Sequence, residues 1–202
     1  MAVPIQSVCV YCGSAPGHDP VYAEAARDVG QTIAQRGMSL VYGGGHVGLM
    51  GMVADAALAA GAKVTGVIPT ALMDREVGHT QLTELRVVKD MHERKALMAE
   101  LADGFVALPG GIGTLEELFE VMTWLQLGYH CKPVGLLNTL GFYDELLRML
   151  DKQRDAGFLK PAHRALLIAE ADITKLLDRM MAFEMPEGVS VFSRRGASTL
   201  GP

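Results

Sequence analysis

FVALPGGIGTLEE, residues 105–117, decides the fold, because it joins an apolar run to a helical pattern through a loop of small residues. The run at residues 105–108 is short and continuously apolar, which is typical of a parallel strand covered on both faces. Residues 115–127 carry helix-forming side chains at helical spacing. The segment therefore predicts one βα unit of a parallel sheet.

The same alternation runs along most of the chain. Further short apolar runs lie at residues 8–11, 39–42, 64–68, 85–88 and 134–137. Helical patterns occupy residues 22–35, 49–60, 92–102, 143–156 and 173–182. Each helix that joins two strands can serve as a right-handed crossover. We therefore expect an α/β fold, a Rossmann-like doubly wound parallel sheet of about six or seven strands flanked by helices.

Length and composition favour one domain. A chain of 202 residues, half of them hydrophobic (50%), can bury one sizeable core. Residues 186–202 are rich in Gly, Ser and Arg. We expect a single Rossmann-like domain over residues 1–185 and a disordered tail over residues 186–202.

Charge and cysteine content limit the partners and the compartment. The net charge of −5 lacks the basic excess that binding to nucleic acid requires. An apolar stretch of membrane-spanning length and a signal peptide are both missing from the pattern, so we expect a cytoplasmic protein without membrane contact. Cys9 and Cys12 have CxxC spacing, but residues three apart on a strand point to opposite faces. Buried structural thiols are favoured over a redox pair.

Three loops of small residues follow predicted strands, at the sheet edge where doubly wound folds bind ligands. They are CGSA at 12–15, GGGHVG at 43–48 and PGGIGT at 109–114. Glycine lets the backbone approach a ligand and present N–H groups to an anion. Tight turns alone would also explain a single such loop, but three together favour a small ligand that carries a phosphate. The candidate contacts in these loops are Gly13, Ser14, Gly43, Gly44, Gly45 and Gly110.

Other phosphate and metal motifs fit poorly. Gly43, Gly45 and Gly48 spell the dinucleotide pattern GxGxxG, but Pro69 and Thr70 stand where its acidic residue would follow the next strand. The Gly-Lys-Ser/Thr ending of an ATP-binding loop is missing from these loops. The six histidines do not have metal-ligand spacing. We expect no cofactor and no essential metal.

Glu117 and Arg94 are the candidate charged groups, and each has a structural explanation. Thr114 and Glu117 have the spacing of a capping box, which would account for both residues at a helix start. Arg94 precedes Leu97, Met98 and Leu101 by three, four and seven residues, so it extends an apolar stripe. Its side chain could reach along the helix and place the guanidinium at the helix end, or it could pair with a structural carboxylate. The functional alternative is that Arg94 contacts a substrate or Glu117, which follows the glycine loop.

Three motifs resemble the Lonely Guy (LOG) family. They are MHERK at 91–95, PGGIGTLEE at 109–117 and YGGG at 42–45. The resemblance extends from about residue 8 to residue 182, and PGGxGTxxE is far more specific than GxGxxG. LOG proteins are phosphoribohydrolases that convert N6-substituted AMP, the cytokinin riboside monophosphates, to the free base and ribose 5-phosphate.

The resemblance implies roles for individual residues. Arg94 and Glu117 would form the catalytic pair, and the stretch from Gly111 through Thr114 would hold phosphate and ribose. Lys95, Glu76 and Thr123 match substrate-contacting positions less closely. The remaining candidates within the motifs are Met91, Ile112, Gly113, Leu115 and Glu116.

The resemblance also implies a homodimer, with which the apolar helix faces around Trp124 and Leu127 are compatible. The loop at 76–83 departs from the plant pattern, so the resemblance does not imply which residues recognise the base. Some relatives carry a lysine decarboxylase label, but the sequence does not spell a pyridoxal phosphate site. Two other functions remain: a non-catalytic carrier of a nucleotide or of the molybdenum cofactor, and a general AMP nucleosidase.

Overall fold

The computed structural model describes residues 4–73, 78–187 and 189. The strands are β1 (Ser7–Tyr11), β2 (Ser39–Tyr42), β3 (Val64–Pro69), β4 (Glu84–Val88), β5 (Gly104–Ala107), β6 (Val134–Leu137) and β7 (Leu167–Glu170). The helices are α1 (Pro20–Gln35), α2 (Gly48–Ala59), α3 (Met91–Leu101), α4 (Ile112–Gln126), α5 (Asp144–Asp155), α6 (Pro161–Arg164) and α7 (Ile173–Met181), with short 3-10 turns η1 (Thr70–Leu72) and η2 (Thr139–Gly141).

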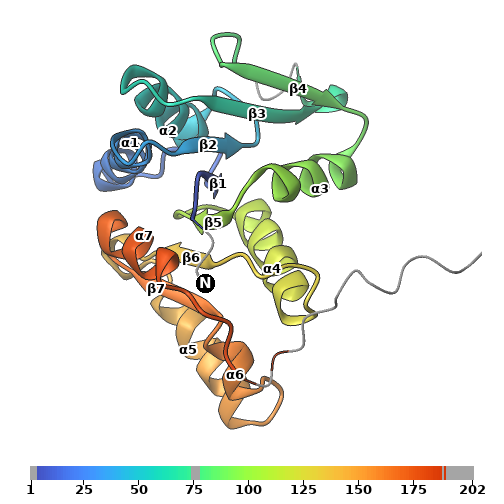
Figure 1. Cartoon of the computed structure of the whole chain (residues 1–202). Helices are drawn as coiled ribbons and strands as arrows, with labels where there is room; N and C mark the ends of the chain where they lie inside the picture. Colours follow the sequence, from blue (N-terminus) through green and yellow to red (C-terminus); the bar gives the residue numbers. More distant parts are fainter. Residues whose placement is uncertain (1–3, 74–77, 188, 190–202) are drawn as a thin grey trace, which may run out of the picture.

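The seven strands form one parallel sheet in the order β4-β3-β2-β1-β5-β6-β7 (Figure 1). The direction of winding reverses between β1 and β5, whose registers pair Val8 with Gly104 and Tyr11 with Ala107. Ligands of doubly wound sheets bind beyond the carboxyl ends of the strands at this reversal. The prediction of a doubly wound α/β sheet is therefore confirmed.

Helices cover both faces of the sheet and bury two hydrophobic layers. One layer packs α1, α2 and α7 against the strands, and the other packs α3, α4 and α5 (Figure 1). Cys9 belongs to the second layer and Cys12 to the first, so the prediction that they face opposite sides is confirmed. Burial raises the pKa of both thiols well above the usual range, and neither is a reactive thiolate.

Two elements and one strand environment differ from the sequence expectations. β7 and the single-turn helix α6 were not predicted, because only two of the four residues of β7 are buried and α6 has no buried residue that would give an apolar pattern. β4 lies at the edge of the sheet, and three of its five residues are exposed, whereas its apolar composition indicated a strand covered on both faces. Within the described residues, each helix is too short or too polar to cross a bilayer. The predicted tail at 186–202 lies mostly outside the described residues.

Candidate active site

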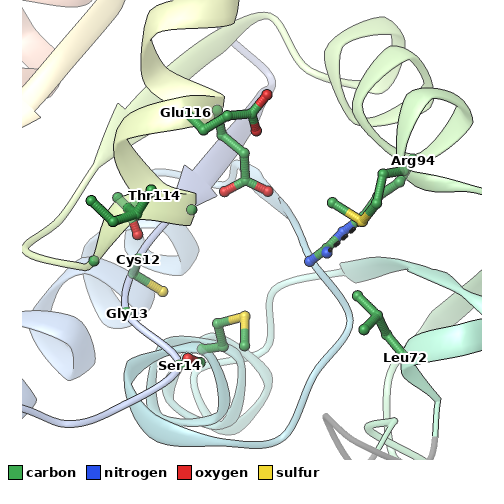
Figure 2. Close-up of a pocket in the computed structure, with 13 residues that line it drawn as sticks. Cys12, Gly13, Ser14, Leu72, Arg94, Thr114 and Glu116 are labelled. Carbon is green, nitrogen blue, oxygen red and sulfur yellow. Dashed lines mark hydrogen bonds between the residues drawn. The ribbon is translucent and has the colours of Figure 1, made fainter.

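A cavity of about 300 Å³ lies at the reversal point, between the loop after β1 and the start of α4. Its walls come from Cys12, Gly13, Ser14, Met50, Leu72, Met91, Arg94, Gly111, Ile112, Gly113, Thr114, Glu116 and Glu117. Figure 2 shows Arg94 extending from α3 into the cavity, opposite Thr114 and Glu116 of α4. The volume is at the lower end of the range for small-ligand sites.

The three glycine loops pack against one another by backbone contact. Gly13 N donates to Pro109 O at 3.2 Å, and Leu49 N donates to Gly13 O at 3.0 Å. A Cβ at Gly110 would lie 2.1 Å from Thr114 Oγ1, and a Cβ at Gly48 would lie 2.3 Å from the Ser14 carbonyl carbon. Only glycine allows these approaches. The loops therefore converge as the sequence predicted.

The N-terminus of α4 opens into this cavity. The N-cap is Gly111, which provides no side-chain cap, and the Cβ positions of Gly111 and Gly113 face open space. The first N–H groups of a helix lack partners within the helix, and the helix dipole makes this end attractive to anions. The arrangement therefore suits a phosphate.

The predicted capping box is wrong. α4 begins at Ile112, so Thr114 is its third residue and not its N-cap. Thr114 is buried against Gly110, and Glu117 lies in the second turn of the helix. The chain enters the helix early because Gly110 and Gly111 permit the close turn. Capping of α4 therefore does not explain Glu117.

Arg94 lies in the first turn of α3, whose N-cap Asp90 accepts from His92 N and Glu93 N at 3.0 and 2.9 Å. Its side chain is buried, as its place in the apolar stripe predicted, and does not extend along the surface. Arg94 Nη2 donates to Gly43 O at 3.1 Å. The second glycine loop thus supplies an acceptor that fixes the guanidinium at the cavity wall.

Glu117 and Cys12 line the same cavity. Burial first, and then the negative charge of Glu117, raises the pKa of the Cys12 thiol. The thiol stays protonated at neutral pH and is a poor nucleophile. Chemistry in this cavity therefore depends on its carboxylates, on Arg94 and on the backbone N–H groups of α4.

Lys95 lies on another side of α3 from the cavity wall. Its Nζ bonds to Glu116 Oε1 at 2.6 Å and to Glu120 Oε1 at 3.0 Å, which joins α3 to α4. Burial alone would lower the pKa of Lys95, but these two carboxylates raise it above the usual value. A Schiff-base lysine must be a neutral amine, so this environment does not suit pyridoxal phosphate chemistry.

The structure brings together most of the predicted site, but some candidates lie elsewhere. Thr123 donates to Phe119 O and lines a separate cavity beside α5 and α6. Among the described residues, the candidates Gly43, Gly44, Gly45, Lys95, Gly110 and Leu115 do not belong to the lining of the cavity that holds Arg94 and Glu117. Gly110 instead lines a neighbouring apolar cavity with Tyr22 and Phe142. Glu76 lies outside the described residues.

Three wall residues were not predicted as site residues. Cys12 follows β1 and was expected to be only a buried structural thiol. Met50 and Leu72 face the cavity from α2 and η1. These two are ordinary apolar residues, and only their position soon after a glycine loop or a strand could have indicated that they line a site.

The fold and the site define a Rossmann-like α/β protein with a cavity at the sheet reversal, beside the N-terminus of α4. A family model described as "Possible lysine decarboxylase" matches residues 50–180. The chain is 49% identical over 187 residues to cytokinin riboside 5'-monophosphate phosphoribohydrolase LOG7 of Arabidopsis thaliana, covering 93% of this chain and 86% of that protein. It is 50% identical over 180 residues to the phosphoribohydrolase LOG of Oryza sativa subsp. japonica, covering 89% and 74%. The chain belongs to the LOG family.

A solved structure with another function shares the architecture. The molybdenum cofactor carrier protein MCP of Chlamydomonas reinhardtii superposes with a TM-score of 0.65 at 22% identity, covering 89% of this chain and 100% of that chain. At this level of identity the similarity shows a common fold and carries no information on ligand or activity.

Proposed function

We propose that this protein hydrolyses the N-glycosidic bond of N6-substituted AMP, and also of AMP, to give the free base and ribose 5-phosphate. The observation that carries the proposal is the cavity at the sheet reversal. It places a buried arginine and Glu117 beside an open helix N-terminus. The identity of about half of all positions with named phosphoribohydrolases supports the same reaction.

The 5'-phosphate binds at the N-terminus of α4. Backbone N–H groups at Ile112, Gly113 and Thr114 are available there, because Gly111 provides no side-chain cap. Contacts to a part of the substrate remote from the reacting bond supply binding energy that positions C1'. Nucleosides without phosphate lack this anchor and react slowly.

Glu117 acts on the sugar. Cleavage of the C1'–N9 bond builds positive charge on the ribose, which a nearby carboxylate stabilises. A water oxygen bonds to C1' while the C1'–N9 electron pair leaves with the purine. Glu117 accepts a proton from this water and returns it to the departing base, so one water is consumed.

Arg94 and the apolar wall complete the site. Arg94 lines the same cavity as Glu117, and its guanidinium contacts the substrate. Met50, Leu72 and Met91 form an apolar surface that suits a purine face or an N6-alkyl group. The preference between adenine and an N6-substituted base is set on this side of the cavity.

Incubation with AMP, isopentenyladenosine monophosphate and adenosine, followed by chromatography, tests the activity. We expect release of free base from both nucleotides, and at least about tenfold slower release from adenosine. Tight nucleotide binding in a calorimetric titration without released base would favour the carrier function. Equal turnover of AMP and adenosine would contradict phosphate anchoring.

Substitution of Glu117→Gln tests the proposed base. The amide keeps the size of the side chain and removes its basicity, so we expect kcat to fall by at least about 10²-fold with an unchanged melting temperature. Glu24→Gln on the exposed part of α1 is the matched control, and it should keep full activity. Full activity of the Glu117→Gln enzyme would exclude Glu117 as the base.

The domain, the assembly and the compartment are parts of the same proposal. Residues 1–185 form the nucleotide-binding catalytic domain, because both hydrophobic layers pack on one sheet. A homodimer would cover Phe119 and Leu127, which lie exposed eight residues apart along α4 and its C-cap. The three free cysteines suit the reducing cytoplasm.

A further inference from the structure

Two histidines and an aspartate meet behind the second glycine loop, outside the cavity. His46 comes from the loop itself, Asp55 from α2, and His79 from the segment that precedes β4. His46 Nε2 lies 3.1 Å from Asp55 Oδ2, and His79 Nε2 lies 2.9 Å from Asp55 Oδ1. Residue spacing did not indicate this cluster, because its members are far apart in the sequence.

Hydrogen bonding fixes the proton positions of the buried histidine. His79 is completely buried, and its Nδ1 accepts from Gln81 N at 3.2 Å. A nitrogen that accepts has no proton, so the ring proton is on Nε2 and is donated to Asp55. The two imidazole rings lie side by side, with centroids 4.0 Å apart and planes tilted by 32°. One carboxylate thus receives two neighbouring donors.

A metal ion is a less suitable interpretation of this cluster. The three ligand atoms lie within 4.8 Å of one another, which is close enough for a common ion. A metal-bound histidine, however, donates a proton from its second nitrogen, and in His79 that nitrogen accepts. The geometry favours a hydrogen-bonded cluster of Asp55, His46 and His79 without a metal, which we call the latch.

The latch restrains the second glycine loop, which lacks side-chain restraints of its own. Gly43, Gly44 and Gly45 have no side chains to anchor them, and consecutive glycines have the largest conformational freedom of any backbone. The restraints come from outside: His79 N donates to Gly44 O at 2.9 Å, and Gly45 pairs with Gly78 in an antiparallel bridge. His46 packs on Gly51 of α2, where a Cβ would lie 2.9 Å from its ring.

The restrained loop supplies the acceptor for Arg94. Arg94 Nη2 donates to Gly43 O, one peptide before the Gly44 carbonyl that His79 N holds. We propose that Asp55, through His46 and His79, is a positioning residue that fixes the Gly43 carbonyl and thereby orients the Arg94 guanidinium in the cavity. The consequence for turnover rests on the proposed function, but the effect on Arg94 itself does not.

A double-mutant cycle measures the effect on turnover. Asp55→Asn keeps the size of the side chain but leaves one oxygen to accept from two donors. We expect it to lower kcat for AMP about tenfold and to leave KM within about twofold of the wild-type value, because the loss of a positioning contact affects turnover more than substrate binding. In an Arg94→Met background the same substitution should change the residual kcat less than about twofold, because the two residues act through one contact. An equal loss in both backgrounds would mean that Asp55 acts independently of Arg94, and the proposal would fail.

A spectroscopic readout separates this proposal from the proposed function. The Nε–H resonance of Arg94, assigned by its loss in Arg94→Met, should exchange slowly with solvent because the side chain is buried. Asp55→Asn should accelerate this exchange at least about tenfold, while the control Asp28→Asn on the exposed part of α1 should not. His46→Gln, which removes only the exposed imidazole, should have a smaller effect in the same direction. Unchanged exchange in both Asp55→Asn and His46→Gln would overturn the latch, even in a fully active enzyme.

Zinc titration tests the competing interpretation of the same residues. The latch predicts that added Zn²⁺ leaves the thermal unfolding midpoint of the wild-type protein and of Asp55→Asn equally unaffected. Stabilisation of the wild type alone would identify the cluster as a metal site and overturn the hydrogen-bonded latch.

Discussion

At the scale of single residues, Gly43 shows how closely the loop and the arginine fit. A Cβ at this position would lie 1.9 Å from Arg94 Nη2. The clash involves the end of a flexible side chain, so Gly43→Ala should displace the guanidinium at a modest stability cost, about 1 kcal/mol. We expect kcat for AMP to fall by at least about tenfold, measured by base release.

A second glycine substitution serves as the control, because it should lower stability and leave turnover unchanged. Gly61 has φ +89° with open space around its Cβ position, and it lies in the turn between α2 and β3, outside the cavity lining. Gly61→Ala should lower the free energy of unfolding by about 1–2 kcal/mol through backbone strain, with kcat unchanged. If Gly43→Ala retained full activity, the contact between Arg94 and the glycine loop would have no importance for turnover.

Residue types predicted some parts of the site better than others. The burial of Arg94 followed from its spacing to Leu97, Met98 and Leu101, because helical periodicity reports which face is covered. The capping box failed because Thr-x-x-Glu records residue types and not the helix start, which Gly110 and Gly111 move to Ile112. The cluster around Asp55 was beyond prediction, since it depends on long-range packing between a loop and a helix.

At the scale of elements, Lys95 joins α3 to α4, the two helices that carry Arg94 and Glu117. Lys95→Met would remove its bonds to Glu116 and Glu120 and leave these carboxylates one turn apart without a cation. We expect a loss of about 1 kcal/mol in the free energy of unfolding. For a domain of this size, this corresponds to a fall in Tm of about 2–4 °C.

The pH dependence of this loss identifies its cause. The pKa of Lys95 is raised in the folded state, so its contribution to stability is complete below the unfolded-state pKa of about 10.4. The contribution declines as the pH rises through the folded-state pKa. Urea unfolding of the wild type and of Lys95→Met should therefore differ at neutral pH and converge as the pH rises above the raised folded-state pKa of Lys95. Lys63→Met, at an exposed position before β3, is the matched control, and a difference that persists undiminished at high pH would exclude the ion pair as the cause.

Elements with strong periodicity were predicted almost to the residue. The pattern placed one helix at 143–156 and another at 173–182, and the structure has α5 at Asp144–Asp155 and α7 at Ile173–Met181. β7 was not predicted, although β2, β5 and β6 are equally short, because only two of its four residues are buried and it ends in Glu170. β7 is defined by its pairing with β6, which is a tertiary contact.

At the scale of the whole molecule, the topology followed from the alternation of apolar runs and helices. Right-handed crossovers leave few ways to arrange such units, so the edge that carries the ligand site could be predicted. The strand order was not predictable from periodicity, because the outward winding on each side of β1 depends on which helix face packs where. The three glycine loops nevertheless marked the reversal point, since only the loops at that edge need close backbone approach.

The proposed homodimer is the remaining property at this scale, and we expect α4 to supply its surface. Phe119, Thr123 and Leu127 are four residues apart in succession, so they lie on one face of the helix and its C-cap, and all three are exposed. We expect Leu127→Glu to convert a dimer to a monomer in sedimentation velocity, because it places a charge in an apolar contact. Phe158→Glu is the matched control, since Phe158 is 87% exposed and lies on another part of the chain, after α5. A wild-type protein that sediments as a monomer at all concentrations would refute the dimer, and a dimer that survives Leu127→Glu would place the interface elsewhere.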